Sequence, residues 1–418
     1  MDRLCIEGNR PLNGSIKIQG SKNAALPILA ATLLVDGVTT LMNCPNITDV
    51  SHMLNLLLDT KSIVSKKEHN IQVNAAYIND TMFTQSDVNC MRCSILMLGA
   101  MLGREKRICL DYPGGCIIGK RPVDIHLNAF QKLGAIIEVT GERIEAECGN
   151  HIGGEVSLPF PSVGATQNII LFSALAKGTT IIHNCAREPE IVSMCEFLNL
   201  AGARILGIGS TDLMIEGVKK LEEIKYEIPS DRIVAGTYLY TAAACGGEIV
   251  LENAPVAQLA SPLKYASMMG CIGELDFENR SIRMNAPQKL NSISKIKTEV
   301  YPGFPTDLQS VLLAALSTAK GESIVEEAIF ENRFIITSEL KKMGANIENE
   351  QNLAKITGVC NLHGEKVAAK ELRGCAALVC AGLMAEGKTI LSGISYLKRG
   401  YEDLPGDIKK LGGKIDWI

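Results

Sequence analysis

The hydrophobic and polar positions of the chain follow one order that recurs along its length. A segment rich in Ala, Leu and other small residues, such as residues 162–175, predicts a helix that ends at a glycine, as in a C-terminal glycine cap. A β-branched run follows, as in Thr179-Thr-Ile-Ile, and predicts a strand. An amphipathic pattern, as in residues 188–202, then predicts a second helix before another strand.

This unit of helix, strand, helix and strand occurs six times, with starts about every 70 residues. Further short strands lie between the units, and the copy that starts at residue 91 matches the others least well. The pattern predicts an α/β fold built from repeats. The glycines expected to end the first helix of each copy are Gly37, Gly103, Gly178, Gly246, Gly321 and Gly387.

The chain length indicates two domains, because 418 residues are too many for one ordinary hydrophobic core. Six units divide naturally into two groups of three. The acidic, proline-containing segment 221–230 is the expected hinge between the groups. The predicted N-terminal strands at residues 4–8 and 15–20 could belong with either group.

Composition and charge exclude several classes of function. The chain is 46% hydrophobic and 21% charged, which is typical of a globular protein and not of a disordered one. Its net charge is −4 and it has no run of basic residues, which argues against a nucleic-acid binder. No apolar stretch is long enough to cross a bilayer, and the N-terminus does not resemble a signal peptide. We expect a cytoplasmic protein with no membrane contact.

The cysteine and histidine patterns give little support for a metal site. The 14 cysteines are scattered, and most are expected to be reduced and to pack in the core. Cys90 and Cys93 have C-x-x-C spacing, which could indicate a metal or redox site, but helix packing is the simpler interpretation because no second ligand pair accompanies them. The six histidines show no metal-binding spacing.

The second copy contains an insertion with a candidate reactive group. Its segment from Gly103 to Gly134 is longer than the equivalent segment of the third copy, and the extra residues include Pro113-Gly-Gly-Cys. Cys116 lies close to Lys120 and Arg121, and nearby cations stabilise the nucleophilic thiolate. The alternative is a surface loop without function, although long loops in compact domains are often functional.

Several cations lie at predicted helix starts, where the helix dipole disfavours them. An anion bound by both dipole and side chain would explain this placement; solvated or locally paired side chains are the alternative. The cations are Lys22, Arg92, Arg232 and Arg373. Copy five instead carries Asp307, which could be an ordinary helix cap. Arg333 and Arg399 follow the strands of copies five and six, and we expect them to face the Cys116 loop across a cleft between the domains.

These observations alone predict a two-domain enzyme with a reactive loop cysteine and an anionic substrate. Phosphate suits this number of cations better than carboxylate does. No cofactor or metal is expected.

Long motifs then resemble one enzyme family. They include residues 21–34 (SKNAALPILAATLL), 113–127 (PGGCIIGKRPVDIHL), 304–307 (FPTD) and 398–403 (KRGYED). Shorter ones are residues 162–165 (SVGA), 229–236 (PSDRIVAG), 331–334 (ENRF) and 371–373 (ELR). Together they resemble the UDP-N-acetylglucosamine 1-carboxyvinyltransferases, a family of enolpyruvyl transferases, over essentially the whole chain.

The resemblance implies a fold of two inside-out α/β barrel domains, each with three βαβαββ-like repeats. Residues 22–229 would form the N-terminal domain, and residues 1–21 plus 230–418 the C-terminal domain. The implied reaction transfers the enolpyruvyl group of phosphoenolpyruvate to the 3′-hydroxyl of UDP-N-acetylglucosamine and releases phosphate. It proceeds by addition and elimination through a tetrahedral ketal, with no metal or cofactor, as the first committed step of peptidoglycan synthesis.

The resemblance also implies residue roles. Cys116 would be the general acid that protonates the methylene carbon, on a loop acting as a lid, and Asp307 would be the base for the 3′-hydroxyl. The epoxide antibiotic fosfomycin would alkylate Cys116. Phosphoenolpyruvate would contact Lys22, Asn23, Arg121 and Arg399, of which Lys22 and Arg399 also take part in catalysis. The UDP-sugar site would comprise Arg92, Arg121, Pro122, Val123, Asp124, Ile125, Ser162, Val163, Gly164, Asp307 and Ile329, and Arg333 and Arg373 would support it.

This sequence departs from the family pattern at two positions. Ile117 stands where Ala is expected, which adds bulk without removing chemistry. Glu371 replaces the Asp of many members and could change how Arg373 is held. Two alternatives are a shikimate-3-phosphate enolpyruvyl transferase, which shares fold and chemistry, and a catalytically silent paralogue.

Overall fold

The computed structural model describes residues 3–78, 80–83, 88, 91–114, 118–119 and 123–418. These residues divide into two compact units. Unit 1 contains the residues up to Gln19, Ile118 and Gly119, and Ser230–Ile418. Unit 2 contains the remaining described residues between Gly20 and Pro229. Each unit has its own hydrophobic core.

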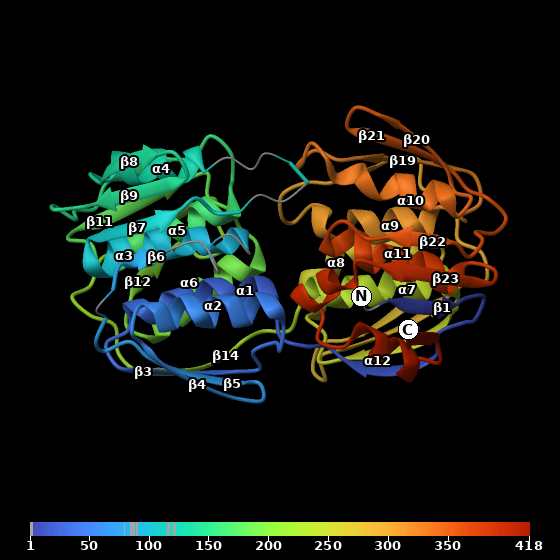
Figure 1. The fold of residues 1–418 in the computed structure, drawn as a ribbon, viewed down its shortest axis with the longest axis horizontal. Coiled ribbons are helices and arrows are strands. Elements are labelled where there is room, and N and C mark those ends of the chain that lie inside the picture. The colour runs from blue at the N-terminus through green and yellow to red at the C-terminus, as the bar shows by residue number, and fades with distance from the viewer. Residues whose placement is uncertain (1–2, 79, 84–87, 89–90, 115–117, 120–122) are drawn as a thin grey trace. The chain divides into compact units, whose positions relative to one another are not determined.

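Each unit is built around helices that are buried on nearly every face (Figure 1). The sequences of these helices are apolar all round, and a helix of that kind is stable only when other elements cover it completely. In unit 2 the central helices are α1 (Lys22–Ala31), α3 (Leu96–Glu105) and α5 (Val163–Ser173). In unit 1 they are α7 (Arg232–Cys245), α9 (Gln309–Leu316) and α11 (Leu372–Met384).

A second set of helices lies further out and keeps an exposed face. They are α2 (Thr48–Asp59), α4 (Asp124–Lys132), α6 (Pro189–Leu200), α8 (Ala260–Met268), α10 (Thr337–Lys342) and α12 (Leu404–Lys410). Short 3-10 helices are η1 (Thr32–Leu34), η2 (Arg92–Ile95), η3 (Val256–Leu259), η4 (Thr306–Leu308), η5 (Arg333–Ile336) and η6 (Ile394–Arg399).

The strands of the described residues form six four-stranded sheets, each with one parallel and two antiparallel pairings. In unit 2 the orders are β14-β3-β5-β4, β6-β7-β9-β8 and β10-β11-β13-β12. In unit 1 they are β22-β23-β1-β24, β16-β17-β15-β2 and β18-β19-β21-β20. The shared pattern makes each sheet one copy of the repeat found in the sequence.

The strands of unit 2 have the following bounds. They are β3 (Val38–Met42), β4 (Ile63–Lys67), β5 (Asn70–Asn74), β6 (Met82–Phe83), β7 (Arg107–Asp111), β8 (Ile136–Thr140), β9 (Arg143–Glu147), β10 (Glu155–Ser157), β11 (Thr179–His183), β12 (Arg204–Leu206), β13 (Asp212–Glu216) and β14 (Ile224–Glu227).

The strands of unit 1 include the two from the N-terminus of the chain. They are β1 (Leu4–Glu7), β2 (Gly14–Lys17), β15 (Gly247–Glu252), β16 (Ile272–Asp276), β17 (Ser281–Ala286), β18 (Ile296–Lys297), β19 (Glu322–Glu326), β20 (Asn346–Glu350), β21 (Leu353–Thr357), β22 (Lys366–Ala368), β23 (Lys388–Ser392) and β24 (Lys414–Trp417).

Burial alternates along the inner strands, as in β9, β13 and β21, because successive side chains point to opposite faces of a sheet. The inner faces cover the central helices and the outer faces are solvated. The fold is therefore α/β with helices inside and sheets outside, which confirms the fold class predicted from the sequence.

The predicted glycine caps are correct at only one of the six positions. Gly246 is the C-cap of α7, whereas Gly37, Gly178, Gly321 and Gly387 lie past the helix end, in the turn before the strand, with positive φ. The prediction is wrong for Gly103, which lies inside α3 because the helix continues to Glu105.

The reason for Gly103 is close helix packing. A Cβ on Gly103 would lie 2.7 Å from the carbonyl oxygen of Leu171, and one on Gly99 would lie 2.5 Å from that of Asn168. Two glycines four positions apart let the backbones of α3 and α5 approach closely. Since Gly99 faces Asn168 and Gly103 faces Leu171, the two helices run in the same direction.

Two features are absent from the described ranges. No helix there is long and apolar enough to cross a membrane. No cluster of three or more His, Cys, Asp or Glu side chains with metal-binding geometry occurs among the same residues. The described cysteines are free thiols. Most of them are buried or partly buried, whereas Cys360 is exposed. Cys90, the first residue of the C-x-x-C pair, lies outside the described residues.

Candidate active site

In unit 1 the carboxylate of Asp307 lies between two buried arginines. Arg333 Nη2 donates to Asp307 Oδ1 at 2.8 Å, and Arg373 Nη2 donates to Oδ2 at 2.7 Å. The Asp307 side chain is 28% exposed, whereas those of Arg333 and Arg373 are 2% and 5% exposed. Asp307 is the second residue of η4, which Pro305 precedes as the N-cap. The arrangement holds a partly accessible carboxylate in a fixed orientation.

Arg373 keeps its charge although its side chain is buried. Burial alone would disfavour the charged form, but the negative charge of Asp307 outweighs it, so the pKa of Arg373 is raised above its usual value. Glu371 is the N-cap of α11, where Oε2 accepts from the backbone N–H of Arg373 at 2.7 Å and Oε1 accepts from that of Gly374. Glu371 Oε2 also lies 3.9 Å from Arg333 Nη1. The longer carboxylate at this position thus holds Arg373 through its backbone.

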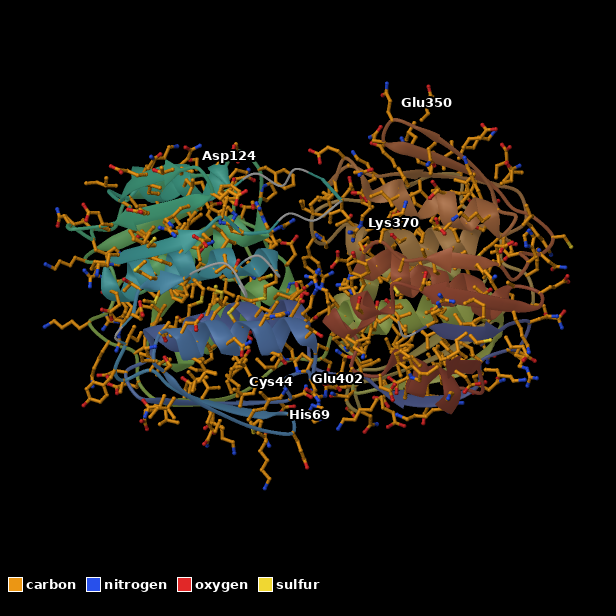
Figure 2. All side chains as sticks on the ribbon, viewed as in Figure 1. Cys44, His69, Asp124, Glu350, Lys370 and Glu402 are labelled. Atoms are coloured by element: carbon orange, nitrogen blue, oxygen red, sulfur yellow. The ribbon has the colours of Figure 1, made fainter. Side chains whose placement is uncertain are left out.

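The segment that carries Arg399 packs against the start of the same helix. A Cβ on Gly400 would lie 2.8 Å from a methyl group of Leu372, the neighbour of Arg373. Tyr401 shares a 2.8 Å hydrogen bond with Thr237. Gln19 fixes the segment further: its Nε2 donates to the Gly400 carbonyl at 3.2 Å, and its Oε1 accepts from the backbone N–H of Glu402, a residue labelled in Figure 2, at 2.9 Å.

In unit 2, Lys22 begins α1 and forms an ion pair with a buried carboxylate. Ser21 is the N-cap, and its Oγ accepts from the backbone N–H of Ala24 at 3.3 Å. Lys22 Nζ lies 3.5 Å from Asp49 Oδ2, with side-chain exposures of 13% and 3%. Asn23 follows and is partly exposed. The ammonium group of Lys22 is thereby directed by Asp49, a residue that the sequence analysis did not identify.

The predicted UDP-sugar residues of unit 2 lie at helix starts that the structure brings together. Ser162 caps α5 as Ser21 caps α1, with its Oγ 3.3 Å from the backbone N of Ala165. A Cβ on Gly164 would lie 3.0 Å from His126, which belongs to the first turns of α4. That contact places Val163 and Gly164 close to the start of α4, where Val123 is the N-cap and Asp124 and Ile125 follow.

Asn168 links these helix starts to Arg92. Its Nδ2 donates to the Ile95 carbonyl at 3.1 Å and bonds His126 Nδ1 at 2.8 Å. Ile95 ends η2, which Arg92 begins. Because α3 and α5 run in the same direction, the starts of η2, α4 and α5 lie at one end of unit 2. Asp124, labelled in Figure 2, is exposed there.

The remaining predicted residues lie in other parts of the structure or outside the described residues. Ile329 lies in the loop after β19 in unit 1. Cys116, Arg121 and Pro122 lie outside the described residues. Arg232, a cation noted at a helix start, is buried at the first position of α7, with its guanidinium 5.8 Å from the ring centre of Tyr301.

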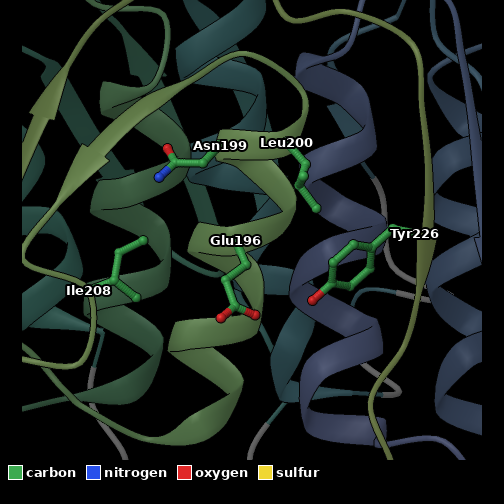
Figure 3. Close-up of a pocket in the computed structure, with 5 residues that line it drawn as sticks. All are labelled: Glu196, Asn199, Leu200, Ile208 and Tyr226. Atoms are coloured by element: carbon green, nitrogen blue, oxygen red, sulfur yellow. The ribbon is translucent and has the colours of Figure 1, made fainter.

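An open groove of about 380 Å³ lies elsewhere on unit 2 (Figure 3). It is lined by Glu196, Asn199 and Leu200 of α6 together with Ile208 and Tyr226. The Asn199 amide is occupied by two hydrogen bonds to the backbone of Ile205, and the Tyr226 hydroxyl donates to the Ser193 carbonyl. None of the residues predicted for the active site lines it.

Comparison with known proteins identifies the family. A family profile described as EPSP synthase (3-phosphoshikimate 1-carboxyvinyltransferase) matches residues 6–408. The chain belongs to this family of enolpyruvyl transferases. Its fold is similar to that of the enolpyruvyl transferase NikO from Streptomyces tendae, with a TM-score of 0.89, 21% identity, and coverage of 100% of this chain and 98% of that one. EPSP synthase from Acinetobacter baumannii is also similar, with a TM-score of 0.78, 18% identity and full coverage of both chains.

Curated relatives with higher identity carry a different name. The chain is 44% identical to UDP-N-acetylglucosamine 1-carboxyvinyltransferase 2 of Caldanaerobacter subterraneus subsp. tengcongensis, covering 99% of both proteins. It is 41% identical to UDP-N-acetylglucosamine 1-carboxyvinyltransferase of Finegoldia magna, covering 100% of this chain and 99% of that protein. The resemblance stated from the motifs is therefore confirmed, and so is the expectation that the chain is a transferase.

Sequence reasoning missed two buried carboxylates that contact predicted site residues: Asp49, which pairs with Lys22, and Glu327, which accepts a hydrogen bond from Ile329. Asp49 stands in the first turn of α2, where an acidic residue needs no special explanation. Glu327 follows β19 and is 2% exposed. A repeat comparison gives a weak signal for Asp49, since Glu190 has the same place in α6.

Proposed function

We propose that this enolpyruvyl transferase transfers the enolpyruvyl group of phosphoenolpyruvate to the 3′-hydroxyl of UDP-N-acetylglucosamine and releases phosphate. The observation that carries the proposal is 44% identity along the whole chain to a protein named for that reaction. The reaction would serve peptidoglycan synthesis, and thereby cell-wall formation, cell shape and cell division.

The proposed reaction has two stages. In the addition, the 3′-oxygen bonds to C2 of phosphoenolpyruvate while a proton is delivered to C3, which gives a tetrahedral ketal with a methyl group. In the elimination, the methyl group loses a proton, the C2–C3 double bond forms again and the C2–O bond to phosphate breaks. A base for the hydroxyl and an acid for C3 are both required, and such groups contribute about 10²–10⁴ each to the rate.

Asp307 is the proposed base. Its carboxylate is 28% exposed and is held by Arg333 and Arg373, so its orientation is fixed before substrate binds. Two guanidinium groups favour the ionised form that accepts a proton. Arg333 and Arg373 thus act through Asp307. Cys116, outside the described residues, is the proposed acid and the proposed site of fosfomycin alkylation.

Many of the proposed anion-binding residues lie at the N-terminal ends of helices. Lys22 and Asn23 at the start of α1, together with Arg121 and Arg399, are proposed to bind phosphoenolpyruvate. The N-terminal end of a helix attracts anions through its dipole and backbone N–H groups. The proposed UDP-sugar residues at such ends are Arg92, Val123, Asp124, Ile125, Ser162, Val163 and Gly164, with Arg121, Pro122, Asp307 and Ile329 completing the set.

A phosphate-release assay tests the proposal. The purified protein with UDP-N-acetylglucosamine and phosphoenolpyruvate should release phosphate, and EDTA should not reduce the rate. Release with shikimate 3-phosphate in place of the UDP-sugar would show the EPSP synthase reaction instead. If neither acceptor supports release, the chain is a catalytically silent member of the family.

A further inference from the structure

Glu327 is a buried carboxylate whose oxygens accept four hydrogen bonds. The residue is 2% exposed and directly follows β19. Its Oε1 accepts from the backbone N–H groups of Ile329 at 2.9 Å and Phe330 at 3.2 Å, and from Thr298 Oγ1 at 2.9 Å. Its Oε2 accepts from Thr306 Oγ1 at 2.9 Å. One side chain therefore joins three separate segments of unit 1.

Two of the three segments carry residues of the proposed site. Ile329 donates its own backbone N–H to Glu327. Thr306 directly precedes Asp307 in η4, and the Thr306 carbonyl accepts from Arg333 Nη2 at 3.3 Å. The Glu327 carboxylate thus links the segments that carry the two proposed substrate contacts, Asp307 and Ile329.

The third segment attaches this arrangement to the sheet. Thr298 Oγ1 accepts from the backbone N–H of Ala328 at 2.9 Å while it donates to Glu327, and the Thr298 backbone N–H donates to the Glu326 carbonyl at 2.9 Å. Thr298 follows β18, the neighbour of β19. Glu327 is therefore fixed on the sheet side by contacts that do not involve Asp307.

Glu327 acts as a hydrogen-bond acceptor and not as a partner in an ion pair within the described residues. Among the ion pairs of the described chain, none involves Glu327. A buried charged group is costly unless hydrogen bonds satisfy it, and a carboxylate can accept at both oxygens. Four donors converging on one side chain meet that condition.

We propose that Glu327 is a positioning residue for enolpyruvyl transfer. It sets the place of Asp307, through Thr306, relative to the Ile329 loop, so that the base and the loop face the same sugar nucleotide. This inference rests on the proposed function, since it assigns Glu327 to the site at which that transfer would occur. A purely structural Glu327 would instead stabilise the unit without affecting turnover of the folded enzyme.

Two threonine variants separate these roles. Thr306→Val removes the hydrogen bond on the Asp307 side, and Thr298→Val removes one on the sheet side. Both should lower the melting temperature. Only Thr306→Val should lower kcat of the folded enzyme, about tenfold, with KM for phosphoenolpyruvate unchanged, because small misplacements of a catalytic group lower the rate steeply. Glu327→Gln should retain most of kcat, since its amide can donate to a reversed Thr306 hydroxyl.

The outcomes are distinguishable. Wild-type kcat in Thr306→Val would overturn the positioning role, and so would an equal loss of kcat in Thr306→Val and Thr298→Val. A kcat that falls with Thr306→Val and is retained in Thr298→Val and Glu327→Gln supports it. A wild-type enzyme that releases no phosphate from either acceptor would overturn the proposed function itself, and Glu327 would lose its assigned task with it.

Discussion

Asp307 and Arg373 lie 66 positions apart in the chain, and the Arg373 guanidinium donates a 2.7 Å hydrogen bond to the Asp307 carboxylate. Arg373 in turn is held by the Glu371 cap at the start of α11. A carboxylate whose partners are buried and fixed loses little orientational freedom when the substrate arrives. The relationship supports the proposal that Asp307 is the base and that its carboxylate is oriented before the substrate binds.

Asp307→Asn should lower kcat by about 10²–10⁴ because an amide cannot accept the hydroxyl proton. The change also removes the nearest negative charge from the buried guanidinium groups of Arg333 and Arg373, and a buried charge that loses its partner costs about 3 kcal/mol of folding free energy. Steady-state kinetics and chemical unfolding measure the two effects. A folded Asn variant with kcat within a factor of about three of wild type would refute the base role.

Cys116 should be the single site of fosfomycin labelling. Burial raises the pKa of the Cys44 thiol to about 12 and that of Cys195 to about 12, which keeps both protonated and unreactive. Cys360 is exposed and serves as the internal control. Mass spectrometry should find one adduct on Cys116 and none on Cys360, and Cys116→Ser should lose the adduct and at least about 100-fold in turnover. Labelling of Cys360 to the same extent would argue against selective reactivity.

Asp49→Asn should weaken phosphoenolpyruvate binding. The Lys22 ammonium lies 3.5 Å from the buried Asp49 carboxylate, and the neutral amide would orient it less firmly. We expect KM for phosphoenolpyruvate to rise about tenfold with a smaller change in kcat. Glu190→Gln is the matched control, since Glu190 has the equivalent place in α6 and Val163 stands where Lys22 would be. An unchanged KM in the Asn variant, or an equal rise in the control, would contradict this account.

His151 should make unit 2 less stable in mild acid. Burial, followed by the charge of Lys106, lowers its pKa to about 4, and Lys106 Nζ lies 2.6 Å from His151 Nδ1. The unfolded chain has the ordinary pKa near 6.5, so it binds the proton more readily between about pH 6.5 and 4. This contribution to stability is therefore complete above about pH 6.5 and is lost progressively as the pH falls toward 4. His151→Gln should flatten this part of the unfolding profile; an unchanged slope would refute the assignment.

His183 should show the opposite dependence. Hydrogen bonds to Asp212 and then Glu155 raise its pKa, with Nε2 2.9 Å from Glu155 Oε1. A raised folded pKa gives a contribution to stability that is complete below about pH 6.5 and is lost as pH rises through the folded value. Asp212→Asn should therefore lower the melting temperature more at pH 6 than at pH 8.5. Equal losses at both pH values would show that the ion pair is not responsible.

The sequence predicted many helices and strands correctly, but it did not predict the contacts between segments that lie far apart in the chain. The recurring order of helix, strand, helix and strand predicted β11, β23 and the helix α6, because local periodicity determines these elements. Gly103 was misassigned because a glycine in a helix cap and a glycine at a helix crossing look alike until Phe172 and Leu171 are seen beside it. Asp49 looked like an ordinary first-turn acid, and its ion pair with Lys22 exists only in three dimensions. Glu327 gave no signal, since burial of one of two adjacent glutamates is decided by distant segments.

Strand β1, near the start of the chain, pairs with two strands near its end. Leu4–Glu7 lies between β23 and β24, and its register runs from Leu391 to Lys388 on one side and from Trp417 to Lys414 on the other. During synthesis on the ribosome, unit 2 can fold once its own residues have emerged, whereas the segment made first must wait for the segment made last. Pairings of such high sequence separation form slowly. A nascent chain stalled before β23 should therefore hold a protease-resistant unit 2 and an N-terminal segment still open to cleavage.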